Sequence, residues 1–170
     1  LYALAVFMGW DPIGRLGALA GSAAGIFALA AFAAMLAPPA WGYPATLLAL
    51  LAGSAVMGAV STAMVWGHWY LTEGALPAWP LKELALWLLA SLAFHWLVFA
   101  VNAAAPVRER PTPSTQIEVG LLDNPAFWLR VGVGLLFPVI LGALSLQTAR
   151  IRAMQSATGL LYIAMGAVFA

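Results

Sequence analysis

Two histidines are the side chains in this chain best suited to binding a cofactor metal. His68 lies in the stretch VWGHWYLTE, where a long apolar run ends, and His95 lies within a second apolar run. An imidazole serves as an axial ligand of haem iron where an apolar slot accepts the porphyrin. The sequence has no cysteine, so it offers no thiolate metal ligand, iron–sulfur cluster ligand or covalent haem attachment. We therefore predict non-covalently bound haem b, one or two groups per chain, with His68 and His95 as iron ligands.

Hydroxyls and sulfur atoms lead away from His68 along one face of its predicted helix. At spacings of three and four residues this stripe comprises Ser54, Met57, Ser61, Met64 and His68. Such spacing places side chains on one helix face. The stripe predicts that Ser61 and Met64 contact a cofactor and that Met57 is a candidate axial ligand. The alternative is that the methionines only fill gaps in a hydrophobic core.

The depths of the two histidines argue against one haem held by both. His95 lies thirteen residues after Lys82, roughly 20 Å into its span at 1.5 Å per residue. His68 lies at the boundary from which that span starts, about 15 to 20 Å away along the membrane normal. Met57 precedes His68 by eleven residues, or about 16 Å, close to the depth of His95. This arithmetic permits a haem ligated by His95 and Met57, with His68 binding a second haem or a quinone. Alternatively, each histidine binds its own haem, and the second iron ligand comes from a helix outside the given sequence or from another subunit.

Each histidine also has a structural interpretation. His95 shares a helix face with Trp87, Ser91, Phe99 and Asn102, and polar groups within a span usually face the interior of a helical bundle. Ser91 is therefore a candidate contact of the cofactor. In the structural interpretation, His95 binds no cofactor and its imidazole forms a hydrogen bond to a neighbouring helix.

The neighbours of His68 are aromatic. Trp66 and Trp69 flank it and are candidate cofactor contacts. The same residue types form the aromatic belt at a membrane boundary, in which case His68 is an interfacial anchor.

Transmembrane helices must position these residues. The chain is 64% hydrophobic and 8% charged with a mean hydropathy of +0.96, whereas soluble domains carry about 25% charged residues. Its apolar runs are continuous and long enough to cross a hydrocarbon core of about 30 Å, which favours helices over a β-barrel. We predict an all-α, polytopic transmembrane helical bundle of about five to six spans, forming one integral-membrane domain over residues 1–170.

Turn residues and prolines divide the chain into spans. Complete spans are predicted at residues 16–36, 45–70, 81–102 and 126–148, and a fifth begins after residues 149–152. Residues 1–10 resemble the tail of another helix, so we expect truncated helices at both ends of a slightly longer chain. Gly17, Gly21 and Gly25 predict close contact with another helix or a groove for a flat ligand. Pro138 predicts a kink in the fourth span.

Charge indicates orientation and partners. Basic residues favour a cytoplasmic location for the turns at 11–15, 71–82 and 149–152. We expect the protein to lie in a prokaryotic cytoplasmic membrane. The lipid bilayer is the expected partner, with a second copy or a redox subunit as candidate protein partners. The net charge of +1 gives no basic field, so nucleic acid is not expected.

These patterns favour an integral membrane haem b protein that takes part in electron transfer, with quinone as a further candidate cofactor. Motifs for nucleotide hydrolysis, zinc proteolysis and serine hydrolysis are not found in the sequence, so any enzymatic role would be that of a redox component. Two alternatives remain open: a structural or assembly subunit of a larger membrane complex, and a small transporter or proton-conducting protein that uses His95.

Overall fold

The computed structural model describes residues 11–37, 42–73, 76–104 and 121–169. Within these ranges the regular secondary structure is entirely helical. The long helices are α2 (Asp11–Leu36), α3 (Gly42–Thr72) and α4 (Trp79–Ala104). A short 3-10 turn, η1 (Leu121–Asp123), precedes a continuous rod made of α5 (Pro125–Leu129), the π-helical segment η2 (Arg130–Leu136) and α6 (Phe137–Arg150). Helix α7 (Met154–Phe169) follows a tight turn.

Four of these helical segments are long and apolar enough to cross a membrane, namely Pro12–Leu36, Gly42–Thr72, Trp79–Ala104 and Pro125–Arg150. Helix α7 is apolar but shorter. The prediction of an all-α, multi-pass transmembrane bundle is therefore confirmed. The helix tail predicted at residues 1–10 lies outside the described residues.

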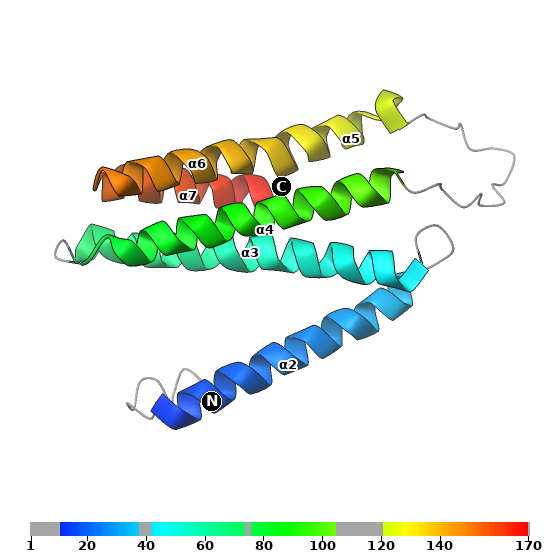
Figure 1. The fold of residues 1–170 in the computed structure, drawn as a ribbon, viewed down its shortest axis with the longest axis horizontal. Helices are drawn as coiled ribbons and strands as arrows, with labels where there is room; N and C mark the ends of the chain where they lie inside the picture. Colours follow the sequence, from blue (N-terminus) through cyan, green and yellow to red (C-terminus); the bar gives the residue numbers. More distant parts are fainter. Residues whose placement is uncertain (1–10, 38–41, 74–75, 105–120, 170) are drawn as a thin grey trace, which may run out of the picture.

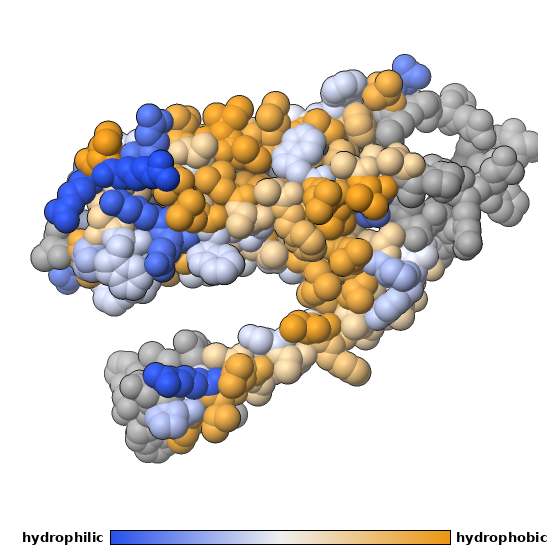
Figure 2. Space-filling model, in the orientation of Figure 1, coloured by the Kyte–Doolittle hydropathy of each residue, from blue (hydrophilic) through white to orange (hydrophobic). Residues whose placement is uncertain are grey.

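Four rods form the body of the bundle, and one helix diverges from it (Figure 1). Helices α3, α4 and α7 and the α5–η2–α6 rod pack side by side, whereas α2 contacts α3 and then slants away. The turn regions that carry Arg15, Lys82, Arg150 and Arg152 lie at the same end of the molecule, where hydrophilic surface collects (Figure 2). We call this end X and the opposite end Y.

Branched aliphatic side chains fill the centre of the bundle. Val56 and Val60 of α3 are buried against leucines of α4 and α7, among them Leu88, Leu92 and Leu161. On α3 the buried residues recur every three or four positions, which is the spacing of one helix face. This packing holds α3, α4 and α7 at fixed rotations about their axes, and so determines which polar side chains meet.

Two buried hydroxyls attach α7 to its neighbours. Thr158 Oγ1 lies 2.9 Å from the carbonyl oxygen of Gly67 and 2.8 Å from that of Met154. Ser145 Oγ donates to the carbonyl oxygen of Ala157 at 3.2 Å. A Cβ atom at Gly67 would lie 2.9 Å from Thr158 Oγ1, so glycine at this position allows the backbones of α3 and α7 to approach closely.

The rod that contains Pro138 changes its hydrogen bonding just before that proline. Residues 130–136 are π-helical, and the N–H of Phe137 donates to the carbonyl oxygen of Gly132, five residues earlier. Proline has no N–H to donate to the residue four positions before it, and single π turns often occur inside longer helices near functional sites. The structure thus has a π-helical segment on the N-terminal side of Pro138, and the kink predicted there stays a prediction.

Helix α2 presents most of its surface away from the rest of the chain. Only 6% of its apolar window is buried, compared with 33% for Pro125–Arg150. A Cβ atom at Gly21 or Gly25 would meet nothing within 4 Å. The close helix contact predicted for Gly21 and Gly25 is therefore not made by the described part of the chain, because α2 slants away from α3, and the contact predicted for Gly17 stays a prediction. The exposed apolar surface faces the lipid bilayer.

Candidate functional site

His95 lies where α4 meets the α5–η2 segment and borders two cavities. The first, the Asn102 cavity, has a volume of about 270 Å³ and is lined by Ala49, His95, Val98, Phe99, Asn102, Ala103, Asn124, Ala126, Phe127 and Arg130. The second, the Gly134 cavity, has a volume of about 500 Å³ and is lined by His95, Ala126, Leu129, Arg130, Val133, Gly134, Leu135, Ala167 and Val168. Because His95, Ala126 and Arg130 line both cavities, we refer to the two together as the His95 site.

Aromatic rings and one cation form the end-Y side of this site. Phe99 of α4 and Phe127 of α5 stack with ring centroids 5.9 Å apart and an interplanar angle of 29°. Arg130 Cζ lies 5.8 Å from the centroid of the Phe99 ring, within the range of a cation–π interaction. The α5–η2 segment supplies both Phe127 and Arg130, and these two side chains reach Phe99 of α4.

His95 is partly buried, and its Nδ1 atom is buried without a hydrogen-bond partner among the described residues. A buried polar atom left unpaired costs about 1 to 3 kcal/mol, so an atom of this kind in a native fold calls for an explanation such as an ion or a water. An imidazole in this setting can ligate a metal or exchange a proton. Its location beside two cavities makes it the strongest candidate for ligand chemistry in the described chain.

His68 lies near end X, on a different part of the surface. Its Nδ1 is 2.9 Å from Tyr162 Oη of α7, and the two rings meet edge to face with centroids 6.3 Å apart. Both residues are exposed. His68 lines neither part of the His95 site. It lies four residues before the end of α3 at end X, whereas His95 lies sixteen residues after the start of α4 at the same end.

The stripe that contains Met57 lies beside the buried face of α3. Met57 is 41% exposed and Ser61 is partly buried, whereas Met64 packs against the core. None of the three lines the His95 site. The structure therefore does not bring Met57 to the cavities that His95 borders.

Trp66, Trp69 and Ser91, the other predicted contacts, are also outside the His95 site. Trp66 and Trp69 pack edge to face with centroids 5.3 Å apart. The indole Nε1 of Trp66 is buried and has no partner among the described atoms, and Trp69 is 50% exposed. Ser91 is partly buried one turn before His95 on α4.

Arg130, Phe127 and Tyr162 were not among the residues predicted from the sequence. Arg130 lies five residues after Pro125, within an apolar helix, and a charge in such a position is itself a sign of function. Phe127 and Tyr162 carry no comparable local signal. Their roles depend on which helix faces become neighbours in the folded bundle.

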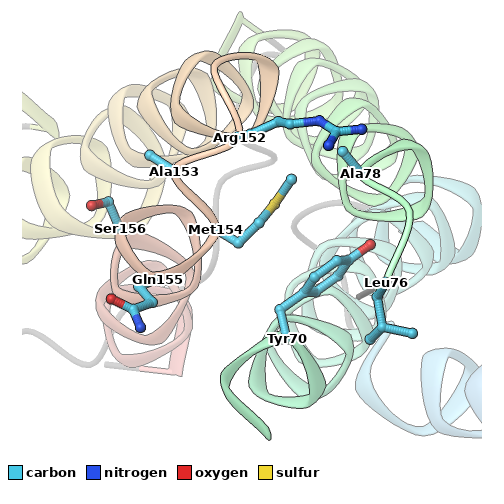
Figure 3. A pocket seen from close by; sticks show the side chains of 8 residues that line it. All are labelled: Tyr70, Leu76, Ala78, Arg152, Ala153, Met154, Gln155 and Ser156. Carbon is cyan, nitrogen blue, oxygen red and sulfur yellow. The ribbon is translucent and has the colours of Figure 1, made fainter. Parts of the chain in front are cut away.

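A further cavity of about 430 Å³ opens at end X, between the end of α3 and the α6–α7 turn (Figure 3). It is lined by Tyr70, Leu76, Ala78, Arg152, Ala153, Met154, Gln155 and Ser156. The hydroxyl of Tyr70 donates to the carbonyl oxygen of Pro77, which ties the end of α3 to the last part of the loop that leads into α4. This cavity contains neither histidine.

Comparison with known proteins gives no family assignment, since no family model, curated protein or solved structure matches the chain. In the described ranges, no three side chains of the types histidine, cysteine, aspartate and glutamate lie close enough to hold a bare metal ion.

Proposed function

We propose that this protein is an integral membrane protein that binds haem b at the His95 site and takes part in electron transfer. One observation carries the proposal: the imidazole of His95 borders two cavities that share lining residues. A haem ligand needs this combination of an imidazole and an adjoining apolar space. Haem would supply a one-electron couple.

The remaining lining groups suit the porphyrin. Most side chains around the Gly134 cavity are aliphatic, and Phe99 and Phe127 add flat aromatic surfaces beside the Asn102 cavity. The guanidinium of Arg130 can pair with a haem propionate, because arginine binds carboxylates through two parallel hydrogen bonds. Arg130 follows Pro125 by five residues, or about 8 Å of helix, which suits a propionate directed toward end Y.

The proposal assigns one axial ligand, His95. Met57 does not line the site, so we do not assign it as the second ligand. An open axial position, or a ligand from a redox partner subunit or a second copy, is compatible with this arrangement. In this proposal end X, with its four basic residues, is the cytoplasmic side of a prokaryotic membrane.

The direct test is an absorption spectrum of the protein purified in detergent after expression with ample haem. We expect a Soret band and, after reduction with dithionite, a sharp α band. A pyridine haemochrome assay should give one haem b per chain. A flat spectrum from folded protein would contradict the proposal.

Arg130→Met should lower the reduction potential of the bound haem by on the order of 50 mV, because a nearby positive charge favours the reduced iron. Arg130→Lys keeps the positive charge and should therefore leave the reduction potential nearly unchanged. A spectroelectrochemical titration measures the effect. Arg150→Met is the matched control, since Arg150 ends α6 at end X; an equal shift in both methionine variants would contradict the placement of Arg130 beside the haem.

A second candidate function is that of a structural or assembly subunit, and the exposure of α2 favours it. An apolar helix with only 6% of its window buried, and with open space at Gly21 and Gly25, offers a surface to a neighbouring subunit as well as to lipid. The same absorption spectrum separates the two candidates, because an assembly subunit requires no haem.

A further inference from the structure

Helices α3 and α7 present a hydrogen-bonded pair of polar side chains on the lipid-facing surface near end X. His68 Nδ1 and Tyr162 Oη are 2.9 Å apart, and Tyr162 is 40% exposed. The two residues are far apart in sequence, so the pair exists only because α3 and α7 pack together. We refer to these residues as the His68–Tyr162 pair.

The helix contact beneath the pair fixes its geometry. Thr158 Oγ1 binds the carbonyl oxygen of Gly67 at 2.9 Å, and both residues are buried. Tyr162 follows Thr158 by four residues on the same face of α7, and His68 directly follows Gly67. The buried contact therefore sets the distance at which the Tyr162 hydroxyl meets the imidazole one turn farther along α7.

The His68–Tyr162 pair has one more hydrogen-bond donor than its internal hydrogen bond uses. If Tyr162 donates to Nδ1, the imidazole proton resides on Nε2 and this N–H donor remains free. If instead Nδ1–H donates to the tyrosine oxygen, the tyrosine O–H remains free. In either arrangement, the pair offers one exposed donor that has no partner among the described residues. Near the membrane boundary, such a donor suits a carbonyl oxygen carried by a molecule dissolved in the bilayer.

The surroundings favour a flat, apolar ligand. His68 is four residues before the end of α3 at Thr72, about 6 Å of helix from end X. Trp69, next in the chain, is 50% exposed, but it lies on a different face of α3 and packs against Trp66. Aromatic rings stack favourably against other flat rings, so the rings of His68 and Tyr162, which meet edge to face, combine a donor with an exposed aromatic surface.

We infer that the His68–Tyr162 pair binds a carbonyl oxygen of a lipid-soluble quinone. This inference deepens the proposed function and rests on it, because a quinone is chosen over other carbonyl compounds as a carrier of electrons within the bilayer. The pair lies toward end X, whereas the His95 site lies toward end Y. Quinone and haem would thus occupy separate sites in one chain.

The test uses the purified full chain in nanodiscs of phosphatidylcholine, with a photoreactive azidoquinone as probe and decylubiquinone as competitor. We expect labelling within α3 and α7 near the pair, suppressed by decylubiquinone. Tyr162→Phe and His68→Phe each remove one partner while keeping a ring, and should weaken competition about tenfold, the loss expected for one hydrogen bond. Tyr43→Phe is the matched control, because Tyr43 is exposed at the opposite end of α3.

Three results would overturn the inference. The first is equal competition in all variants, and the second is labelling confined to other helices. The third concerns phospholipid ester carbonyls, which lie at a similar depth. If decylubiquinone competes about tenfold better in ether-linked lipid, the ester carbonyl is the usual occupant and the quinone assignment fails.

Haem content recorded on the same samples separates this inference from the proposed function. Tyr162→Phe should leave the haem spectrum unchanged. Normal haem content without quinone-dependent labelling would overturn the inference alone. Quinone-dependent labelling of a chain without haem would overturn the proposed function and leave the His68–Tyr162 site in place.

Discussion

His95→Ala should abolish haem binding. In the proposed site, His95 is the one imidazole that borders the two cavities, so alanine removes the iron ligand and leaves only apolar contacts and Arg130. We expect the affinity for haem to fall by at least about tenfold, the effect of losing about 1.4 kcal/mol or more of binding energy, and the Soret band of the purified variant to disappear as haem is lost during purification. The measurement is the pyridine haemochrome assay, normalised to protein.

Two further variants keep this result interpretable. His68→Ala removes the other histidine, which lies outside the His95 site, and should retain the full haem content. His95→Gly leaves space for free imidazole, and added imidazole should restore the Soret band if the imidazole group itself is what binds the iron. Retention of haem in His95→Ala, or its equal loss in His68→Ala, would reject the assignment of His95 as the ligand. Circular dichroism should show unchanged helix content in all three variants.

The helices of this protein were predictable because the membrane imposes strong local constraints. The spans predicted at 45–70 and 81–102 correspond to Gly42–Thr72 and Trp79–Ala104. In each case a continuous apolar run, ended by prolines, glycines or charges, sets the length. The separation of His68 and His95 also followed from helix rise alone, because the connection between their helices is short and makes them antiparallel.

The details of the site were not predictable, because they depend on how helices rotate and lean against one another. The meeting of His95 with Arg130 requires a particular rotation of α4 against the α5–η2 segment, and the π-helical turns of η2 alter the rotation that an ideal helix would give. Tyr162 gave no local signal, since its partner His68 is 94 residues away. Met57 matches His95 in depth, but depth does not specify the direction of a side chain.

Gly67→Ala should lower the free energy of unfolding by about 2 kcal/mol relative to Gly58→Ala. Both substitutions lie in the interior of α3, where alanine is favoured over glycine by about 1 kcal/mol, and this gain cancels in the comparison. At Gly67, the new Cβ would lie 2.9 Å from Thr158 Oγ1 and 3.2 Å from its Cγ2, whereas at Gly58 it would meet nothing within 4 Å. Overpacking of this kind typically costs 1 to 3 kcal/mol.

Reversible unfolding with sodium dodecyl sulfate, followed by circular dichroism, measures this difference. Thr158→Ala removes the two nearest of the three atoms that the new Cβ would meet, so the double variant Gly67→Ala/Thr158→Ala should be more stable than the sum of the single effects predicts, by about 1 kcal/mol. Strictly additive effects would show that α3 and α7 are not in contact at Gly67. Because the same contact sets the distance between His68 and Tyr162, Gly67→Ala should also weaken decylubiquinone competition, which links the packing of the two helices to the ligand site that they form.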